Sequence, residues 1–477
     1  MTVGYRLEQA YLPADTSSEL VEMPVGRLLA ERCAQYPDRV ALVGARHGTG
    51  ERVRLTYGQL YREAARVATA LSQFAGPGES VAVWAPNVVE WPVIQYAAAL
   101  SGLVLVALNP VLRDDELEYA LTHSGAKVLL HADVSRDYPL AEVATRVCDR
   151  IEGLQRISLS EDRWRAAEPD CAELPDVGVD EVAMLQYTSG TTGRPKGVVL
   201  THRALVNVAK LTLEVAAAPA GAVCVNPLPM FHTAGCVIAT LGPLWLGGTA
   251  VLIDRFTPAA ALDVLRAERP DVLFYVPAIL DALLAAQRAD SAPAPSIPII
   301  MGGAALVAPE LIDGAAEVFG ATVLNLFGQT ELAPVLSMTC PGDTRADRLA
   351  TVGRPLPQVE CKIVDPASGA VAAVGEPGEI CARGYQQFTE YLNDPAATAA
   401  TVDADGFVHT GDLGTMDGRG YLTVTGRLKD IIIRGGENIS PADIERQLVD
   451  HEQVTDIAVL GLPDDQWGEI VAAVLRA

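Results

Sequence analysis

The sequence predicts an α/β protein in which layered α/β segments are followed by a smaller, β-rich part. Segments with helical periodicity alternate with short apolar runs over most of the chain, a pattern typical of parallel sheets covered by helices. Near residue 350 the pattern changes to short strands separated by Gly, Pro and Asp turns. The length of 477 residues suggests about three folded units.

The elements of the first part follow in chain order from their periodicity. We expect an amphipathic helix over residues 60–74 and a second helix over residues 88–100. Apolar runs predict buried strands at residues 80–84, 103–108, 128–130, 250–253 and 320–326. Residues 291–296, which are rich in Ser, Ala and Pro, predict a linker.

The later part of the chain predicts shorter elements. Strands are expected at residues 359–364, 378–383, 420–425, 431–433, 455–461 and 469–475. A helix should begin after residue 440, with Ser440 as its N-cap and Pro441 at its first helical position.

The composition excludes several classes of protein. A net charge of −24 argues against non-specific nucleic-acid binding, which needs a basic surface. The eight cysteines form no CxxC pair and no His/Cys cluster, so we expect mostly buried thiols in a reducing compartment. The amino end lacks the apolar run of a signal peptide, and residues 91–108 predict a buried helix and strand rather than a membrane span. We therefore expect a soluble, cytoplasmic protein.

The segment most informative about function combines three glycines, four hydroxyl side chains and two cations, in Tyr187-Thr188-Ser189-Gly190-Thr191-Thr192-Gly193-Arg194-Pro195-Lys196-Gly197. Glycines allow successive backbone N–H groups to face one anion, and hydroxyls and a lysine add further donors. A Gly/Ser/Thr run alone would be explained by a flexible surface loop. The cations, and the strand expected at residues 198–200, favour a phosphate site instead. The run differs from the GxxxxGK[ST] pattern. Thr201 should cap a helix that begins near His202.

Six motifs in this order resemble those of the acyl-adenylate-forming superfamily, which includes acyl-CoA synthetases, adenylation domains of peptide synthetases and firefly luciferase. The first motif is the loop at residues 187–197. The others are Leu228-Pro229-Met230-Phe231-His232, Gly302-Gly303-Ala304-Ala305, Phe327-Gly328-Gln329-Thr330-Glu331, His409-Thr410-Gly411-Asp412, and Gly426-Arg427-Leu428-Lys429-Asp430 with Gly435-Gly436-Glu437-Asn438-Ile439. The chain most resembles a carboxylate–CoA ligase of this superfamily.

The resemblance implies a division into domains. An N-terminal AMP-binding domain of layered α/β subdomains would span residues 1–428, with the β-rich subdomain at about residues 350–428. A small, mobile α+β lobe would occupy residues 429–477 and rotate at Lys429 between two half-reactions. Family members usually carry a lysine in a later motif, and no lysine follows Lys429 here. We therefore expect a truncated sequence with an incomplete lobe.

The resemblance also implies a reaction and a role for each candidate residue. A carboxylate attacks the α-phosphorus of ATP, pyrophosphate leaves, and the acyl group passes to the thiol of coenzyme A. The β- and γ-phosphates are held by Thr188, Ser189, Gly190, Thr191, Thr192 and Lys196. Thr330 donates to the α-phosphate, and Glu331 binds Mg²⁺. The nucleoside is bordered by Gly303, Ala304, Ala305, Phe327, Gly328, Asp412 and Arg427. His232 borders the acyl pocket.

Each of these residues also has a structural interpretation. Asp412 could be an ordinary turn aspartate, Glu331 a carboxylate in the first turn of a helix, and His232 a core histidine. The ordered set favours the functional interpretation for all three. Two departures from the family pattern are Phe327, which replaces the more usual tyrosine, and Gln358, which stands where glycine is common.

Three functions remain open at the level of the sequence. The first is a carboxylate–CoA ligase. The second is a superfamily member that uses another acceptor or oxyanion, such as a carrier-protein thiol or nitrite in the diazotisation of arylamines. The third is a nucleotide-binding protein with impaired adenylation, suggested by the missing lysine. The sequence identifies neither the acid nor the oligomeric state.

Overall fold

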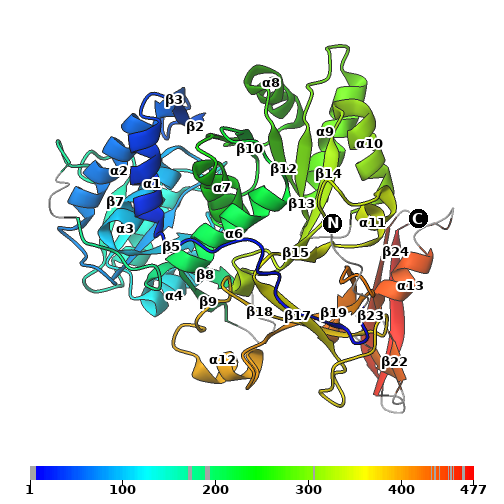
Figure 1. Ribbon diagram of the computed structural model, residues 1–477. Coiled ribbons are helices and arrows are strands. Elements are labelled where there is room, and N and C mark those ends of the chain that lie inside the picture. The colour runs from blue at the N-terminus through cyan, green and yellow to red at the C-terminus, as the bar shows by residue number, and fades with distance from the viewer. Residues whose placement is uncertain are drawn as a thin grey trace.

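The part of the chain that the structure describes folds into four β-sheets with helices around them (Figure 1). The computed structural model describes residues 7–169, 174–188, 194–303, 307–430, 432–434, 437–439, 441–448, 451, 454, 456–464 and 468–476. Two sheets belong to the layered part of the chain, one to the β-rich part, and one to the C-terminal part.

A six-stranded sheet lies in the first layered region. Its strands, in spatial order, are β7 (Gln155–Ser158), β6 (Val128–His131), β4 (Ser80–Trp84), β5 (Val104–Leu108), β8 (Val182–Thr188) and β9 (Lys196–Thr201). All pairs are parallel except that β9 runs antiparallel to β8 at the edge. Every residue of β4, β5 and β6 is buried, because helices cover both faces of a parallel sheet. The strands expected at residues 80–84, 103–108 and 128–130 are confirmed.

A nine-stranded sheet forms the second layered region. Its strands, in spatial order, are β16 (Arg354–Pro355), β15 (Ser337–Met338), β14 (Thr322–Phe327), β13 (Ile299–Gly303), β12 (Val272–Tyr275), β10 (Val223–Asn226), β11 (Thr249–Leu252), β2 (Val40–Ala45) and β3 (Arg52–Thr56). The strands from β14 to β2 are parallel, and the outer ones are antiparallel. The strands expected near residues 250–253 and 320–326 are confirmed within two residues.

Helices separate and cover these two sheets. Between the sheets pack α1 (Val25–Gln35), α3 (Glu90–Ser101), α6 (His202–Val215) and α7 (Ala239–Trp245), with α2 (Tyr57–Leu71) beside α3. Outside the six-stranded sheet lie α4 (Asp114–Ser124) and α5 (Leu140–Cys148); outside the nine-stranded sheet lie α8 (Pro258–Glu268), α9 (Pro277–Ala289) and α10 (Pro309–Phe319). Thr201 Oγ1 accepts a hydrogen bond from Ala204 N, so the predicted cap of the helix beginning at His202 is confirmed.

The β-rich part forms an antiparallel sheet of five strands. Their order is β1 (Tyr11–Leu12), β17 (Val359–Val364), β18 (Gly378–Gly384), β19 (Val408–Met416) and β20 (Leu422–Arg427). The short helix α11 (Arg345–Ala350) precedes β17 in the chain, and α12 (Pro395–Thr401) lies between β18 and β19. The structure accounts for Gln358, since its φ of 66° is left-handed and favours glycine. Its side-chain amide donates to Ser18 O, which helps to hold this conformation.

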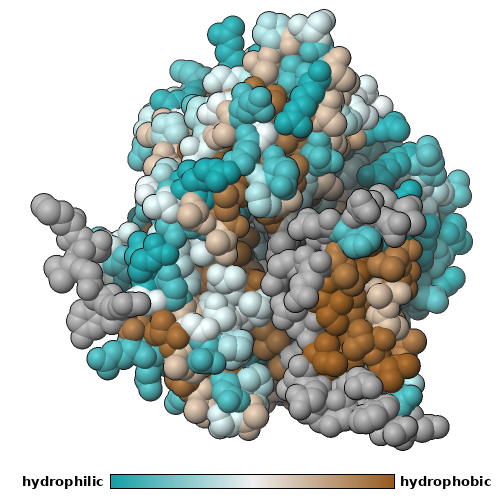
Figure 2. Space-filling view, turned by 90° about the vertical axis from the view of Figure 1, so that its right-hand side faces the viewer, coloured by the Kyte–Doolittle hydropathy of each residue, from teal (hydrophilic) through white to brown (hydrophobic). Residues whose placement is uncertain are grey.

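The C-terminal sheet has the strand order β22 (Glu437–Ile439), β21 (Ile432–Arg434), β24 (Gly468–Arg476) and β23 (Asp456–Asp464), with α13 (Pro441–Leu448) packed against β23. Pairing puts Leu460, Leu462 and Val474 on one face of the hairpin of β23 and β24. These side chains are exposed, and Figure 2 shows an apolar region on this side of the molecule. Ser440 lies outside the described residues, and the domain boundary at residue 428 stays a prediction.

The seven cysteines within the described residues are free thiols, and five of them are buried. Residues 91–108 form α3 and β5, as expected. None of the helices in the described ranges has the length and apolar character needed to cross a membrane.

Candidate active site

Strand pairing brings together the two ends of the predicted phosphate loop. Thr188 is the last residue of β8 and lies opposite Lys196, the first residue of β9. Ser189, Gly190, Thr191 and Thr192 fall outside the described residues. Thr188 and Lys196 therefore flank the loop at the carboxyl end of β8, the end at which ligands bind in open α/β sheets.

One tyrosine links Lys196 to Glu331. Lys196 Nζ lies 4.5 Å from the centroid of the Tyr391 ring, a cation–π distance. The Tyr391 hydroxyl donates a hydrogen bond of 2.7 Å to Glu331 Oε1. Burial, followed by the Glu331 charge, raises the pKa of Tyr391, so the phenol keeps its proton and remains a donor. Glu331 is only 8 % exposed, so its charge acts in a partly desolvated environment.

Backbone hydrogen bonds hold this link in place. The segment of residues 388–392 runs beside β9, where Leu392 N donates to Gly197 O at 2.8 Å. At its other end, Phe388 N donates to Glu331 O, also at 2.8 Å. The loop end and the glutamate, about 135 residues apart by numbering, are therefore neighbours in space, and the segment between them includes the ring that both contact.

Thr330 and Glu331 begin a short 3-10 helix, η3 (Thr330–Leu332), which follows β14 after Gly328 and Gln329. Phe327 ends β14. A Cβ atom on Gly328 would lie 2.1 Å from Pro334 O, so close packing of backbone requires glycine here. This tight passage carries the chain from the sheet edge into η3.

Gly302 and Gly303 end β13 and also have a packing reason to be glycine. A Cβ atom on Gly302 would lie 1.9 Å from Tyr275 O, and one on Gly303 would lie 2.0 Å from Leu326 O. These contacts are with the neighbouring strands β12 and β14. Glycine at both positions is therefore required for strand packing, whether or not a nucleotide approaches. Ala304 and Ala305 lie outside the described residues.

A second group of predicted site residues lies on the five-stranded sheet, around Asp412. Asp412 lies on β19 opposite Arg427 of β20, and Arg427 Nε is 3.0 Å from Asp412 Oδ1. Burial raises the pKa of Asp412, while the nearby charges of Arg427 and Lys429 oppose that shift. Arg427 is exposed, and Lys429 lies exposed in the turn η4 (Leu428–Asp430). Asp412 is thus a buried carboxylate that faces cations at the surface.

His232 follows β10 in the chain and comes just before the π-helix η2 (Ala234–Ile238). Its side chain is exposed, with the ring 4.4 Å from that of Phe231. The surrounding protein desolvates the imidazole enough to lower its pKa, which favours the neutral form. His232 is therefore not the core histidine of the structural interpretation.

A hollow of about 610 Å³ lies elsewhere on the six-stranded sheet. Its lining includes Ser80, Val104 and Val182, the first residues of β4, β5 and β8, which is the opposite end of the sheet from Thr188. Asp180 and Glu181 add negative charge to the lining. Neither the position nor the charge suits a polyphosphate.

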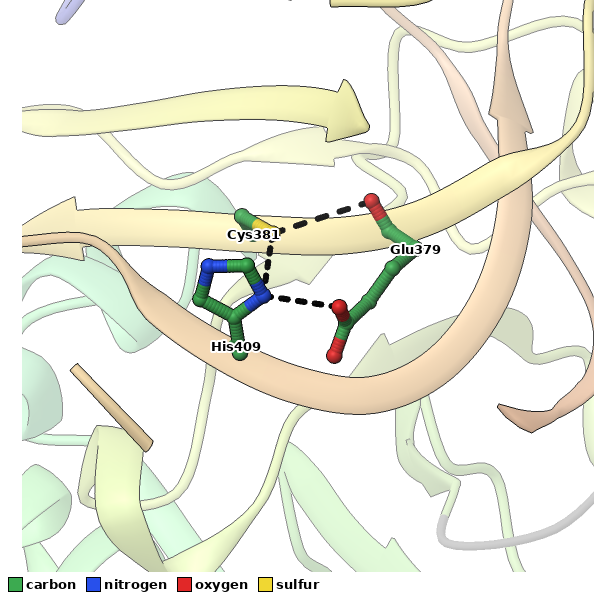
Figure 3. Close-up of side chains that lie close together, drawn as sticks. All are labelled: Glu379, Cys381 and His409. Atoms are coloured by element: carbon green, nitrogen blue, oxygen red, sulfur yellow. Dashed lines mark hydrogen bonds and ion pairs between the residues drawn. The ribbon is translucent and has the colours of Figure 1, made fainter. Parts of the chain in front are cut away.

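Glu379, Cys381 and His409 could supply ligand atoms for a metal ion (Figure 3). Their donor atoms lie within 4.8 Å of one another. Both Glu379 oxygens already interact with the protein, one with Gly411 N and the other with His409 Nδ1. Burial raises the pKa of the Cys381 thiol, which opposes formation of the thiolate that metals bind. The cluster is better explained as a hydrogen-bonded structure.

Sequence reasoning did not single out Tyr391 or Glu379, and it quoted His409 only as part of a motif. Tyr391 contacts Glu331, 60 residues away in the chain, and Glu379 contacts Gly411, 32 residues away. A tyrosine beside an Asn-Asp-Pro turn, and a glutamate in a strand, carry no local signal of such contacts. The only signal in the sequence was that His409 begins the His409-Thr410-Gly411-Asp412 motif, which marks this stretch as part of the candidate site.

Comparison with known proteins identifies the family. The model of the AMP-binding enzyme family matches residues 29–392. The chain is 37 % identical to a feruloyl-CoA synthase of Amycolatopsis sp., over 90 % of this chain and 84 % of that protein. It is 32 % identical to the mitochondrial medium-chain acyl-CoA ligase of Rattus norvegicus, over 98 % of this chain and 81 % of the ligase.

Solved structures agree with this result. The o-succinylbenzoate CoA synthetase of Bacillus subtilis, in complex with its acyl-adenylate intermediate, superposes with a TM-score of 0.82 at 29 % identity. The match covers 96 % of this chain and 89 % of the synthetase. The predicted α/β fold and the predicted resemblance are both confirmed, and the chain belongs to the AMP-binding enzyme family.

Proposed function

We propose that this protein joins a carboxylic acid to coenzyme A through an acyl-adenylate formed from ATP. The observation that supports this most directly is the Tyr391 ring, which links Lys196 at the end of the phosphate loop to buried Glu331. A lysine beside phosphate-binding hydroxyls, with a carboxylate next to it for a hard cation, suits a magnesium–triphosphate. The family, whose relatives include acyl-CoA ligases, gives the reaction.

The first step is attack of the acid's carboxylate on the α-phosphorus, with loss of pyrophosphate. Lys196 and Thr188 bind the β- and γ-phosphates, and Thr330 donates to the α-phosphate. Among the described residues, Glu331 accepts one side-chain hydrogen bond, at Oε1, which leaves Oε2 for Mg²⁺. The ion, when bound, offsets the charge of the phosphates. Because charge stays on phosphate oxygens throughout, these residues act by position and electrostatics.

Asp412 and Arg427 face the ribose, while Phe327, Gly328 and Gly303 border the base. Buried Asp412 can accept hydrogen bonds from the ribose hydroxyls in a site where such bonds are strong. In the second step the coenzyme A thiol attacks the acyl carbon and AMP leaves. Lys429 lies in an exposed turn directly before the C-terminal sheet, a suitable place for a rotation between the two steps.

The acid enters beside His232, whose exposed ring and neighbour Phe231 offer a partly apolar border. Its class follows from the relatives, which act on feruloyl and medium-chain acyl groups, and from the structural neighbour that holds a succinylbenzoyl-adenylate. A hydroxycinnamic, a medium-chain and a succinylbenzoic acid are therefore the first candidates. The free cysteines of the described residues support a reducing compartment such as the cytoplasm.

The test is formation of AMP and acyl-CoA from ATP, Mg²⁺, coenzyme A and each acid of a panel built on these three classes. We expect AMP and acyl-CoA in equal amounts, measured by mass spectrometry, with at least one acid. Omission of coenzyme A should leave acyl-AMP bound to the enzyme. ATP binding by calorimetry without pyrophosphate release, for every acid, would overturn the proposal.

A further inference from the structure

The residues around Asp412 interrupt the regular pairing of β18 with β19. Glu379 lies opposite Leu413 and Cys381 lies opposite His409. Between these two pairs, β18 has one residue and β19 has three. Thr410, Gly411 and Asp412 therefore form a bulge. Bulges of this kind turn a side chain away from the direction that a regular strand would give it. The direction of Asp412 thus depends on what holds the bulge.

Glu379 holds it from the neighbouring strand. Its Oε1 accepts a hydrogen bond of 2.9 Å from Gly411 N, and its Oε2 lies 2.7 Å from His409 Nδ1 (Figure 3). One carboxylate therefore binds both the residue before the bulge and the residue at its centre. Glu379 is 7 % exposed, so little water competes for these hydrogen bonds.

The backbone of the bulge needs this support. Gly411 has a φ of 73°, a left-handed conformation. Thr410 Oγ1 donates to Ile380 O at 2.7 Å and accepts from Asp412 N at 3.1 Å. Thr410 closes the bulge on one side and Glu379 on the other.

His409 is itself held on its far side. Its Nε2 lies 3.6 Å from Asp403 Oδ2, and that oxygen accepts a hydrogen bond of 2.9 Å from Lys362 Nζ. The imidazole therefore sits between two carboxylates, with a lysine balancing the outer one. This arrangement orients the ring toward Glu379 and fixes the Glu379 carboxylate in turn.

We propose that Glu379, oriented by His409, is a positioning residue that holds the bulge so that Asp412 faces the ribose of the nucleotide. The inference rests on the proposed function, because it needs Asp412 to contact the ribose. Glu379 touches neither nucleotide nor acid. Its effect is on the direction of the Asp412 carboxylate.

The experiment compares ATP with 2′-deoxy-ATP in pyrophosphate release by the whole chain. The ratio of kcat/KM for the two nucleotides reports the contact with the 2′-hydroxyl, whereas a general loss of folded or active protein lowers both values equally. Asp412→Ala should reduce the ratio toward one. Glu379→Ala should raise the KM for ATP by about tenfold, the effect of one lost hydrogen bond to a charged group, and reduce the ratio by a similar factor.

Glu360→Ala is the matched control. Glu360 is a carboxylate on β17 of the same sheet, and it too holds two partners, Tyr11 and Arg383. Its removal should leave the nucleotide ratio unchanged. In the Asp412→Ala background, Glu379→Ala should change the ratio no further, because the two residues act through one contact.

Glu379→Gln keeps the shape and one acceptor oxygen for Gly411 N, and should recover most of the ratio lost in Glu379→Ala. If the alanine variant does not express, Glu379→Asp replaces it. Its shorter side chain cannot reach both Gly411 N and His409 Nδ1, so the ratio should fall below that of Glu379→Gln, and an unchanged ratio would count against the inference. A fall in kcat/KM by the same factor for both nucleotides in Glu379→Ala would overturn the positioning role. If Asp412→Ala itself leaves the ratio unchanged, the ribose assignment within the proposed function fails instead.

Discussion

The phosphate side and the ribose side of the candidate site both depend on a buried carboxylate, but they are built differently. Glu331 contacts Tyr391, which is itself held between β9 and η3 in the body of the molecule. Asp412 contacts Arg427, which is exposed and lies two residues before the exposed Lys429. The first carboxylate accepts a neutral hydrogen bond, and the second pairs with a cation.

The difference follows from the surroundings of the two groups. Residues 388–392 tie Glu331 to β9, which is buried at every residue after Lys196, so a shift there would disturb a packed sheet. Asp412 lies on a bulge of an antiparallel sheet, where local shifts disturb fewer contacts. The phosphate side suits chemistry that needs a constant geometry, whereas the ribose side lies next to the part of the chain that is predicted to rotate.

The largest expected effect comes from Glu331→Gln on the constant side. The amide keeps the hydrogen bond from Tyr391 but carries no charge for the cation, so Mg²⁺-dependent pyrophosphate release should fall by about 10²–10³. The matched control is Glu360→Gln, because Glu360 also accepts a tyrosyl hydrogen bond, from Tyr11 at 2.6 Å. Wild-type rates in Glu331→Gln, with an unchanged melting temperature in both variants, would show the metal assignment to be wrong.

Lys429→Pro tests the predicted rotation next to the ribose side between the two steps. Proline holds φ near −65° and should slow one half-reaction by about 10²-fold while the other stays close to wild type. Pyrophosphate exchange measures the first step, and transfer from a preformed acyl-adenylate to coenzyme A measures the second. Lys429→Ala, which keeps backbone freedom, separates loss of the side chain from the restriction of φ. If both steps run at wild-type rates in the proline variant, a rotation at this residue is refuted.

Tyr391→Phe should have a moderate effect. The ring stays beside Lys196, while Glu331 loses its donor, so adenylation should slow by about tenfold, the effect of one hydrogen bond to a charged group. Tyr11→Phe removes the corresponding hydroxyl from Glu360. Tyr11 and Glu360 lie on β1 and β17 of the five-stranded sheet, which contains neither Lys196 nor Glu331, so the rate should stay unchanged. An equal loss in both variants would mean that the effect is on stability alone.

The smallest expected effect is on stability at Asp412. Burial raises its pKa in the folded protein above the ordinary value, so the carboxylate destabilises the fold at neutral pH, and this penalty disappears as the pH falls through the raised pKa. Asp412→Asn should therefore raise the melting temperature of the ligand-free protein by roughly 1–2 °C at pH 7. The gain in melting temperature should shrink as the pH is lowered. The variant should also have a higher KM for ATP than the wild type. A lower melting temperature at pH 7 would show that the ion pair with Arg427 outweighs burial.

The sequence predicted strand bounds best where a strand is buried on both faces of a layered sheet. β4 has the predicted bounds, residues 80–84, because a strand buried on both faces is apolar along almost its whole length. Thr201 caps α6 as expected, since a cap depends on residues within one helical turn. In the β-rich sheet, β17 has the predicted bounds, but its pairing with β1 near the amino end was not predicted, because no local pattern indicates a partner that distant.

The candidate site divides in the same way. The sequence by itself determined the family, the strands buried on both faces and the motifs that make up the candidate site, because motif spacing and apolar periodicity are written locally in the chain. Only the tertiary structure decided that Tyr391 stands between Lys196 and Glu331, and that Glu379 accepts a hydrogen bond from Gly411 within the bulge that contains Asp412. Those contacts join residues far apart in the chain, and their geometry depends on how the sheets pack and where strand pairing is interrupted.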